Sequence, residues 1–260
     1  MSSTFAHVDQ NISEIDYYID RRQKKKERKA SGRNRQQSGL TLREITPLTD
    51  TQREVFKAYN SGYNAVLHGC AGTGKTFLSS YLAIRDIMNK VEQKQQLIIV
   101  RSVVPSRDMG FLPGSITEKS KIYEEPYRAI FTDLFGRGDA YDVLKQKQKV
   151  VFTTTSFVRG QTWDDAIIIV DEFQNLSWQE LNTVITRVGE NSRIIFSGDG
   201  KQDDLTSERY STESGAAKFI SVLSKMDSFS SIDFGPDDIV RSDFVREYIQ
   251  TCYNMGIYGG

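Results

Sequence analysis

A glycine-rich segment, GCAGTGKT at residues 69–76, lies between an apolar run and a helical pattern. The run AVLHG at 65–69 predicts a strand, and the residues from Lys75 to about Asn89 predict a helix. Glycines at such a junction let backbone N–H groups surround an anion at the helix N-terminus. The G-x-x-x-x-G-K-T spacing therefore predicts a phosphate-binding loop, or P loop.

The residues of this loop have separate expected roles. Lys75 is expected to reach the β- and γ-phosphate oxygens, and the Thr76 hydroxyl is expected to bind Mg²⁺. The other positions are expected to bind the nucleotide: Gly69, Cys70, Ala71, Gly72, Thr73 and Gly74. The sequence thus predicts ATP and Mg²⁺ as cofactors.

Four further apolar runs predict strands. They are LIIVR (97–101), VVFTTTS (150–156), AIIIVD (166–171) and RIIFSGD (193–199). Continuous rather than alternating runs are typical of parallel strands covered on both faces. Helices are expected at 49–62 and at 177–189, where Ser177 and Glu180 have capping-box spacing. Strands alternating with helices predict an α/β fold with a mainly parallel sheet and helices on both faces.

Two carboxylates stand at the end of the strand 166–171. Asp171, at the tip, is expected to hold Mg²⁺ through water, and Glu172 is expected to polarise the attacking water. Acidic residues often end strands for no catalytic reason. Here the pair follows a P loop in an alternating fold, and this context favours the catalytic interpretation.

Two glutamines are further candidates. Gln202, after the strand 193–199, is placed to hydrogen-bond the γ-phosphate, with an ordinary polar loop as the alternative. Gln52 precedes the P loop and is placed either to read the adenine edge or to serve as the N3 residue of its own capping box. One side chain does not easily do both, and we favour the adenine contact.

The net charge of zero hides an asymmetry. Residues 21–35 hold nine Lys and Arg against one Glu, and the rest of the chain has 25 basic against 33 acidic residues, a net charge of −8. Residues 1–40 are therefore predicted to be a basic N-terminal extension, and 41–260 the folded domain. The extension is either a solvated terminus or a tether for nucleic acid.

Composition excludes several classes of protein. No run approaches the ~18 apolar residues of a membrane span, and the start lacks a secretory pattern. Two cysteines and two histidines with no clustered spacing argue against a structural zinc. We expect a cytoplasmic protein that does not bind membranes.

The motif set resembles the PhoH family of ATPases, and most closely the PhoH-like proteins of tailed bacteriophages. The segments that carry the resemblance are GCAGTGKT (69–76), RSVVPSRDMGFLPG (101–114), YEEPYRAIF (123–131), TSFVRGQT (155–162), VDEFQN (170–175), VITRVG (184–189), SGDGKQDDL (197–205) and DIVRSDFV (238–245). They span most of the chain, and GFLPG together with DE-x-QN is specific.

The resemblance implies a single RecA-like domain, akin to the motor lobes of superfamily 1 helicases. It also implies ATP hydrolysis, a link to RNA or single-stranded DNA, and assembly into a hexameric ring, located in the host cytoplasm if the chain is phage-encoded. Arg159 becomes a candidate for phosphate or nucleic-acid contact, and Arg241 for an arginine finger. Because a single lobe is not expected to present Arg241 to its own phosphates, a neighbouring subunit is expected to supply it. Arg101 and Arg187 are further candidates for phosphate or nucleic-acid contact that sequence spacing alone does not rank.

The chain departs from the family pattern at two places. Arg101-Ser102 replaces the usual Arg-Pro, and Arg241-Ser242-Asp243 replaces Arg-His-Pro. The chain leaves no room for the nuclease domain of some relatives, so nuclease activity is not expected. Two other functions stay open: a nucleotide-gated scaffold or regulatory ATPase in phosphate-starvation or host metabolism without motor activity, and a kinase similar to thymidine kinases.

Overall fold

The computed structural model describes residues 39–102, 116–199 and 215–255. The chain divides into two units, Met1–Thr41 and Leu42–Gly260, and the second contains every element described below. The extension expected at 1–40 lies almost wholly outside the described residues, as does Gln202.

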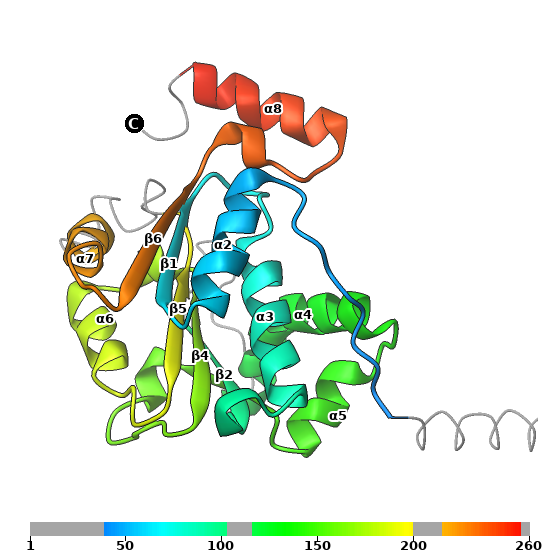
Figure 1. Ribbon diagram of the computed structural model, residues 1–260, viewed down its shortest axis with the longest axis vertical. Coiled ribbons are helices and arrows are strands. Elements are labelled where there is room, and N and C mark those ends of the chain that lie inside the picture. The colour runs from blue at the N-terminus through cyan, green and yellow to red at the C-terminus, as the bar shows by residue number, and fades with distance from the viewer. Residues whose placement is uncertain (1–38, 103–115, 200–214, 256–260) are drawn as a thin grey trace, which may run out of the picture. The chain divides into compact units, whose positions relative to one another are not determined.

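A single parallel sheet forms the centre of the second unit (Figure 1). Its strands are β1 (Asn64–Gly69), β2 (Gln96–Arg101), β3 (Val150–Thr154), β4 (Ala166–Asp171), β5 (Arg193–Ser197) and β6 (Phe229–Phe234). Their order is β3-β2-β4-β5-β1-β6, and every neighbouring pair is parallel. The predicted α/β class is therefore confirmed.

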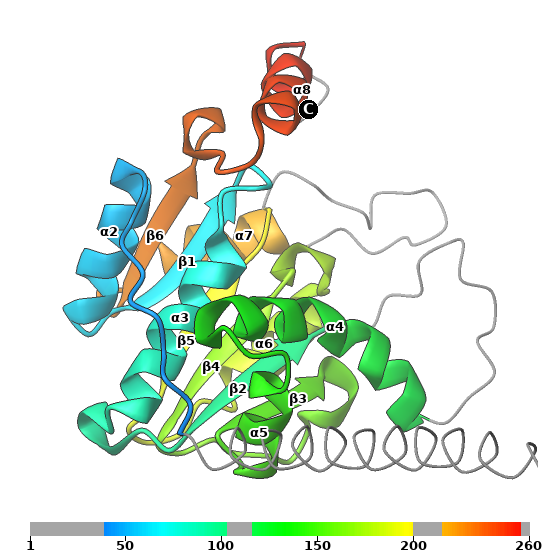
Figure 2. The same cartoon turned by 90° about the vertical axis from the view of Figure 1, so that its right-hand side faces the viewer.

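Helices cover both faces of the sheet, with α6 and α7 on one side and α2, α3, α4 and α5 on the other (Figure 1, Figure 2). The helices are α2 (Asp50–Asn60), α3 (Lys75–Met88), α4 (Ile116–Phe135), α5 (Ala140–Gln146), α6 (Trp178–Ile185), α7 (Ala216–Leu223) and α8 (Asp243–Asn254). Short 3₁₀ turns are η1 (Val91–Gln93), η2 (Thr155–Phe157), η3 (Phe173–Asn175) and η4 (Pro236–Asp238). Among the described helices, none is long and apolar enough to cross a membrane.

The core follows from the continuous apolar strands. All six residues of β4 are buried, because helices cover the sheet on both faces. On the α6 and α7 side, Val66, Ile168 and Phe196 pack with Leu181 and Phe219 of the helices. Each large apolar side chain buried in this way contributes ~1.5–3 kcal/mol, and together they hold the strand ends in place.

Local signals predicted where elements begin better than where they end. The Ser177–Glu180 capping box is present at the start of α6, but the helix ends at Ile185, one turn before the predicted Gly189. It ends early because the chain turns at 186–187 and then pairs with the connection before β4, where Trp163 N–H donates to Arg187 O over 2.9 Å. The strands predicted to reach 156 and 199 end at Thr154 and Ser197.

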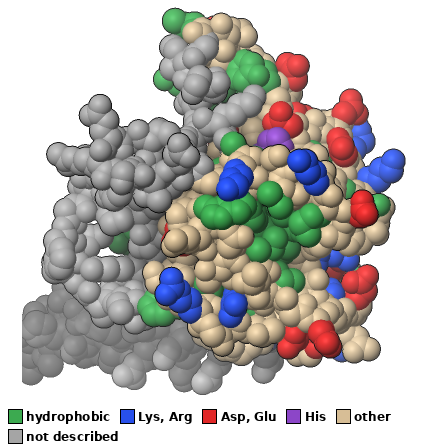
Figure 3. Space-filling model, turned by 90° about the vertical axis from the view of Figure 1, so that its left-hand side faces the viewer, with side chains coloured by type: hydrophobic (Ala, Val, Ile, Leu, Met, Phe, Trp, Pro, Cys, Tyr) green, Lys and Arg blue, Asp and Glu red, His purple; other side chains and the backbone are tan. Residues whose placement is uncertain are grey.

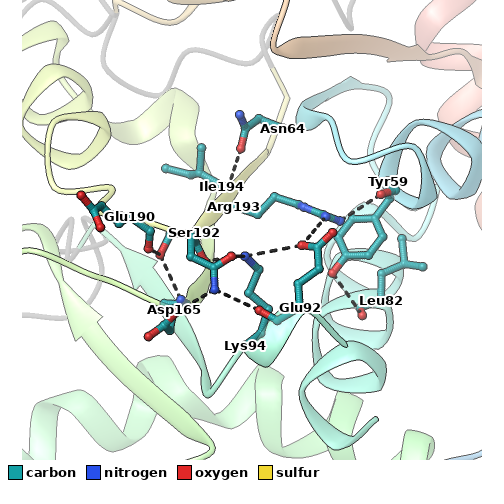
Figure 4. A network of polar contacts seen from close by, with 12 residues as sticks. Tyr59, Asn64, Leu82, Glu92, Lys94, Asp165, Glu190, Ser192, Arg193 and Ile194 are labelled. Carbon is teal, nitrogen blue, oxygen red and sulfur yellow. Dashed lines mark hydrogen bonds and ion pairs between the residues drawn. The ribbon is translucent and has the colours of Figure 1, made fainter. Parts of the chain in front are cut away.

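A polar network closes the amino-terminal edge of the sheet (Figure 4). The Arg193 guanidinium lies 4.5 Å from the centre of the Tyr59 ring and donates to Tyr59 O over 2.9 Å. It also pairs with Glu92 at 3.3 Å, and Lys94 Nζ donates to Asn191 Oδ1 over 2.8 Å. Arg193 is buried, so its charge is satisfied by partners of this chain.

Candidate nucleotide site

The P loop connects the end of β1 to the start of α3. Gly69 has φ +102°, and a Cβ there would overlap Phe234 O of β6, so glycine is required at the strand end. Gly74 has φ +84° and precedes the first helical residue, Lys75. The first turn of a helix has unpaired N–H groups and the positive end of the dipole, both of which suit a phosphate.

Lys75 is held against the backbone of its own loop. Its Nζ donates to Gly69 O over 2.8 Å and to Cys70 O over 2.7 Å. The side chain is buried, and burial lowers the pKa of the ammonium group, although the Asp199 and Glu172 carboxylates oppose this shift. Phosphate oxygens could replace the two carbonyl acceptors, as the sequence prediction requires.

Thr76 and Asp171 are in contact although they follow strands that are not neighbours. Thr76 comes after β1, Asp171 ends β4, and β5 lies between these two strands. Thr76 Oγ1 donates to Asp171 Oδ1 over 2.7 Å and lies 3.3 Å from Ser197 Oγ of β5. Mg²⁺ in P-loop proteins takes a hydroxyl, one or two carboxylates and phosphate oxygens. The hydroxyl and the carboxylate therefore fit the cation that the sequence predicts.

Glu172 follows directly and turns out of the strand with φ +53°. Gln174 Nε2 donates to its Oε2 over 2.6 Å. Burial raises the pKa of the Glu172 carboxyl, the neighbouring Asp171 charge raises it further, and the Gln174 hydrogen bond lowers it. A carboxyl with a raised pKa is a better proton acceptor when ionised, which suits the role of a general base.

Gln174 is a site residue that sequence reasoning did not single out. It is buried, and its Oε1 accepts the Asp199 N–H over 3.0 Å. A Cβ on Gly198 would overlap the same oxygen, so the glycine allows this close approach. Gln174 thus connects Glu172 to the end of β5. The DE-x-Q spacing was the available signal.

Tyr127 of α4 was also missed. Its hydroxyl donates to Asp171 Oδ2 over 2.6 Å, and the side chain is fully buried. Burial raises the pKa of this phenol well above its usual range, the Asp171 charge raises it further, and Arg101 opposes the shift. Arg101 stands beside Asp171 in the register of β2 and β4, so this arginine lies close to the carboxylates of Asp171 and Glu172.

Gln52 fastens α2 to the P loop. Its Nε2 donates to Thr73 O over 3.0 Å, and its Oε1 accepts Leu48 N–H over 2.8 Å. Thr49 Oγ1 caps the helix by accepting Gln52 N–H over 3.2 Å. The side chain therefore does not complete a capping box with the Thr49 N–H. The adenine contact stays a prediction.

Arg241 lies beside the P loop of its own chain. Val240 N–H donates to Gly72 O over 3.0 Å, and Arg241 Cγ is 3.0 Å from where a Cβ on Gly72 would stand. The chain after β6 and η4 therefore passes beside the P loop of the same chain, a path that the sequence did not lead us to expect. The arginine-finger role stays a prediction.

The other two arginines lie apart from the P loop. Arg159 is exposed after η2, which follows the edge strand β3, four places from β1 in the sheet. Arg187 precedes β5 and therefore lies near the amino ends of the strands, whereas the P loop lies at their carboxyl ends. Its Nη1 donates to Gln161 O over 3.5 Å. Arg187 cannot contact a phosphate bound at the P loop; contact with nucleic acid stays a prediction for both.

The sheet is parallel, a P loop follows β1, and two carboxylates stand at the end of β4, which is separated from β1 by β5 alone. These features define a protein of the P-loop nucleotide-binding class. The family model of PhoH-like proteins matches residues 44–254. The chain belongs to the PhoH family.

Curated relatives agree with this assignment. A PhoH-like protein of Bacillus subtilis (strain 168) is 32% identical over 200 residues, which are 76% of this chain and 61% of the relative. Protein PhoH of Escherichia coli (strain K12) is 30% identical over 205 residues, 77% of this chain and 56% of the relative. The chain thus spans about three fifths of the length of these relatives.

Solved structures resemble the chain at low sequence identity. The large terminase of a thermophilic bacteriophage has a TM-score of 0.46 and 12% identity, covering 80% of this chain and 51% of the terminase. The Pif1 helicase of Candida albicans has a TM-score of 0.39 and 17% identity, covering 81% of this chain and 44% of the helicase.

Proposed function

We propose that this chain is a Mg²⁺-dependent ATPase whose turnover is coupled to binding RNA or single-stranded DNA. The observation that supports it most is the hydrogen-bonded set beside the P loop, in which Thr76 contacts Asp171 and Gln174 contacts Glu172. A hydroxyl and a carboxylate for the cation, and a second carboxylate for water, are the groups that phosphoryl transfer to water needs.

The residues divide the chemistry as follows. Lys75 exchanges its two carbonyl acceptors for phosphate oxygens of the nucleotide. Glu172 accepts a proton from a water molecule, whose oxygen forms a bond to the γ-phosphorus while the bond to the ADP oxygen breaks. Gln174 holds the carboxylate in position. Thr76 and Asp171 would hold Mg²⁺, which neutralises phosphate charge when it is bound.

Coupling to nucleic acid is supported by charge. Residues 21–35 carry nine basic residues against one acidic residue. Two further arginines lie toward the carboxyl ends of the strands: Arg101 is the last residue of β2, and Arg159 follows β3 and η2. Basic groups bind the phosphate backbone with release of counterions. The proposal also includes two points made from the sequence: that the chain is most similar to the PhoH-like proteins of tailed bacteriophages, and that it is located in the cytoplasm.

We also propose a ring of subunits, expected to be hexameric. Exposed apolar side chains gather on the side of the molecule where α7 lies (Figure 3). Val222 of α7 and Met226 just after it are 44% and 39% exposed. Exposed apolar patches of this kind are typical of protein interfaces.

One comparison tests the function: the rate of ATP hydrolysis with and without RNA, single-stranded DNA and duplex DNA. We expect turnover that needs Mg²⁺ and rises with a single-stranded polynucleotide. Turnover unaffected by every polynucleotide would favour the nucleotide-gated scaffold. Transfer of phosphate to thymidine rather than to water would replace the proposal with a kinase.

A further inference from the structure

We propose that Tyr127 is a positioning residue for the magnesium carboxylate, and that its hydroxyl orients Asp171 so that one carboxylate oxygen faces the P loop. This inference rests on the proposed function. Tyr127 lies on α4, outside the P loop and the β4 strand end. The Tyr127 hydroxyl donates to Asp171 Oδ2 over 2.6 Å, the distance of a strong hydrogen bond to a charged acceptor.

The two oxygens of Asp171 are assigned to different elements. Oδ1 accepts from Thr76 at the start of α3, and Oδ2 accepts from Tyr127 of α4. Asp171 is only 4% exposed, so water competes little for either oxygen. A carboxylate held at Oδ2 keeps Oδ1 directed at the P loop when Thr76 turns from the carboxylate to a cation.

The ring that carries this hydroxyl cannot easily move. Tyr127 is 0% exposed, and its ring centre lies 5.8 Å from that of Phe152 in β3. A buried ring in a close-packed interior occupies one rotamer. The hydroxyl is therefore presented at a fixed point, which is how a hydrogen bond from outside the metal's own ligands tunes a metal-binding carboxylate.

The chain offers a matched control on the neighbouring helix. Tyr141 of α5 is also buried, and its hydroxyl donates to the Glu124 carboxylate over 2.9 Å. Tyr127→Phe and Tyr141→Phe each remove one buried phenol hydroxyl from a carboxylate. Only the first carboxylate belongs to the nucleotide site, so the pair separates a loss of stability from a loss of cation positioning.

The test is equilibrium binding of a fluorescent ADP analogue, with Mg²⁺ and with EDTA, after thermal unfolding confirms that both variants fold. Mg²⁺ should raise the affinity for the analogue, and we expect Tyr127→Phe to reduce this gain about tenfold or more. A factor of this size corresponds to the free energy of one hydrogen bond to a charged group. Affinity in EDTA is expected to be unchanged, and Tyr141→Phe is expected to keep the wild-type gain.

An equal Mg²⁺-dependent gain in all three proteins would overturn the inference, as would an equal loss for Tyr127→Phe with and without Mg²⁺. A wild-type protein that binds no nucleotide would instead remove the proposed function. If Tyr127→Phe does not fold, the Tyr127 hydroxyl proton of the wild type is followed by NMR. Its chemical shift is expected to change with ADP and Mg²⁺ but not with ADP and EDTA, and no difference between the two would also overturn the inference.

Discussion

At the scale of single residues, the proposed function assigns the binding of charge and the activation of water to different residues. Lys75 lies on the P loop and its ammonium group binds loop carbonyls, whereas Glu172 follows β4 and is bonded to Gln174. A lysine that binds phosphate contributes to the ground state and the transition state alike, whereas a base acts in the chemical step alone. Substituting the two residues should therefore give different defects.

Glu172→Gln is expected to lower ATP turnover by ~10²–10⁴ while ATP stays bound, because only the proton acceptor is lost. Lys75→Ala is expected to weaken triphosphate binding. Single-turnover hydrolysis and nucleotide retention on a filter distinguish the two defects. Wild-type turnover by Glu172→Gln would show that another group is the base.

The pH dependence tests the role of Gln174. Glu172 accepts a proton only when ionised, so turnover is full above its pKa and is lost as the pH falls through it. Because burial raises this pKa, the acid limb is expected above the ordinary range of glutamic acid, ~4.3. Gln174→Ala removes a hydrogen bond that lowers the pKa, so the limb should move to higher pH. Gln179→Ala, on the exposed side of α6, is the control and should leave the limb in place.

The sequence allowed the positions of the P loop and of the β4 end in the fold to be predicted, because these depend on spacing along the chain. Thr76 and Asp171 meet once the strands are parallel and ordered, as they are here. Tyr127 could not be found in this way, because its contact depends on how α4 packs against the sheet. The path of residues 239–241 beside the P loop could not be predicted either, because it has no signal in the sequence.

At the scale of elements, one strand of the sheet, β6, was not predicted from the sequence. The strand β6 reads FSSIDF, in which polar residues interrupt the apolar pattern, yet it pairs with β1 over its full length. Three of its residues are only partly buried, as expected of an edge strand. The five predicted strands are those with continuous apolar runs. The other edge strand, β3, is also only partly buried and was predicted, so an uninterrupted apolar run, rather than burial on both faces, made a strand visible in the sequence.

The network around Arg193 should stabilise the amino-terminal edge of the sheet without affecting nucleotide binding. Arg193→Ala removes a hydrogen bond from a buried charge to Tyr59 O and a contact with the Tyr59 ring, so we expect a loss of about 2–4 kcal/mol in unfolding free energy. Glu92→Gln, at a half-exposed partner, should cost less than ~1 kcal/mol. Denaturant unfolding measures both, and a change in ATP affinity would contradict the assignment to stability alone.

At the scale of the whole molecule, the position of Arg241 bears on how an oligomer would work. Arg241→Ala is expected to lower turnover about a thousandfold if the guanidinium reaches the γ-phosphate. Arg246→Ala, in the exposed first turns of α8, is the matched control. Because Arg241 lies by its own Gly72, a mixture of Lys75→Ala and Arg241→Ala subunits should stay inactive. Recovery of activity after subunit exchange would place the finger in a neighbouring subunit.

The basic extension should act on nucleic acid alone. Removing residues 1–40 is expected to leave basal ATP turnover intact and to weaken polynucleotide binding. If the extension neutralises ~5 phosphates of a single strand, the slope of log K against log salt should fall by roughly 3.5. Titrations at several salt concentrations measure this slope. An unchanged slope and affinity in the truncated protein would show that the extension is only a solvated terminus.

The segment between β6 and α8 has a thermodynamic consequence. Val240 bonds to the P loop at Gly72, and Asp238 accepts from Thr51 at the start of α2, so residues 238–240 join the P loop to both ends of the described fold. Consider a ligand that occupies the P loop and, by shifting this segment, also shifts the equilibrium position of α8. Linkage is reciprocal. A partner that binds α8 in only one position therefore changes the affinity for nucleotide by the same factor by which nucleotide changes the affinity for that partner.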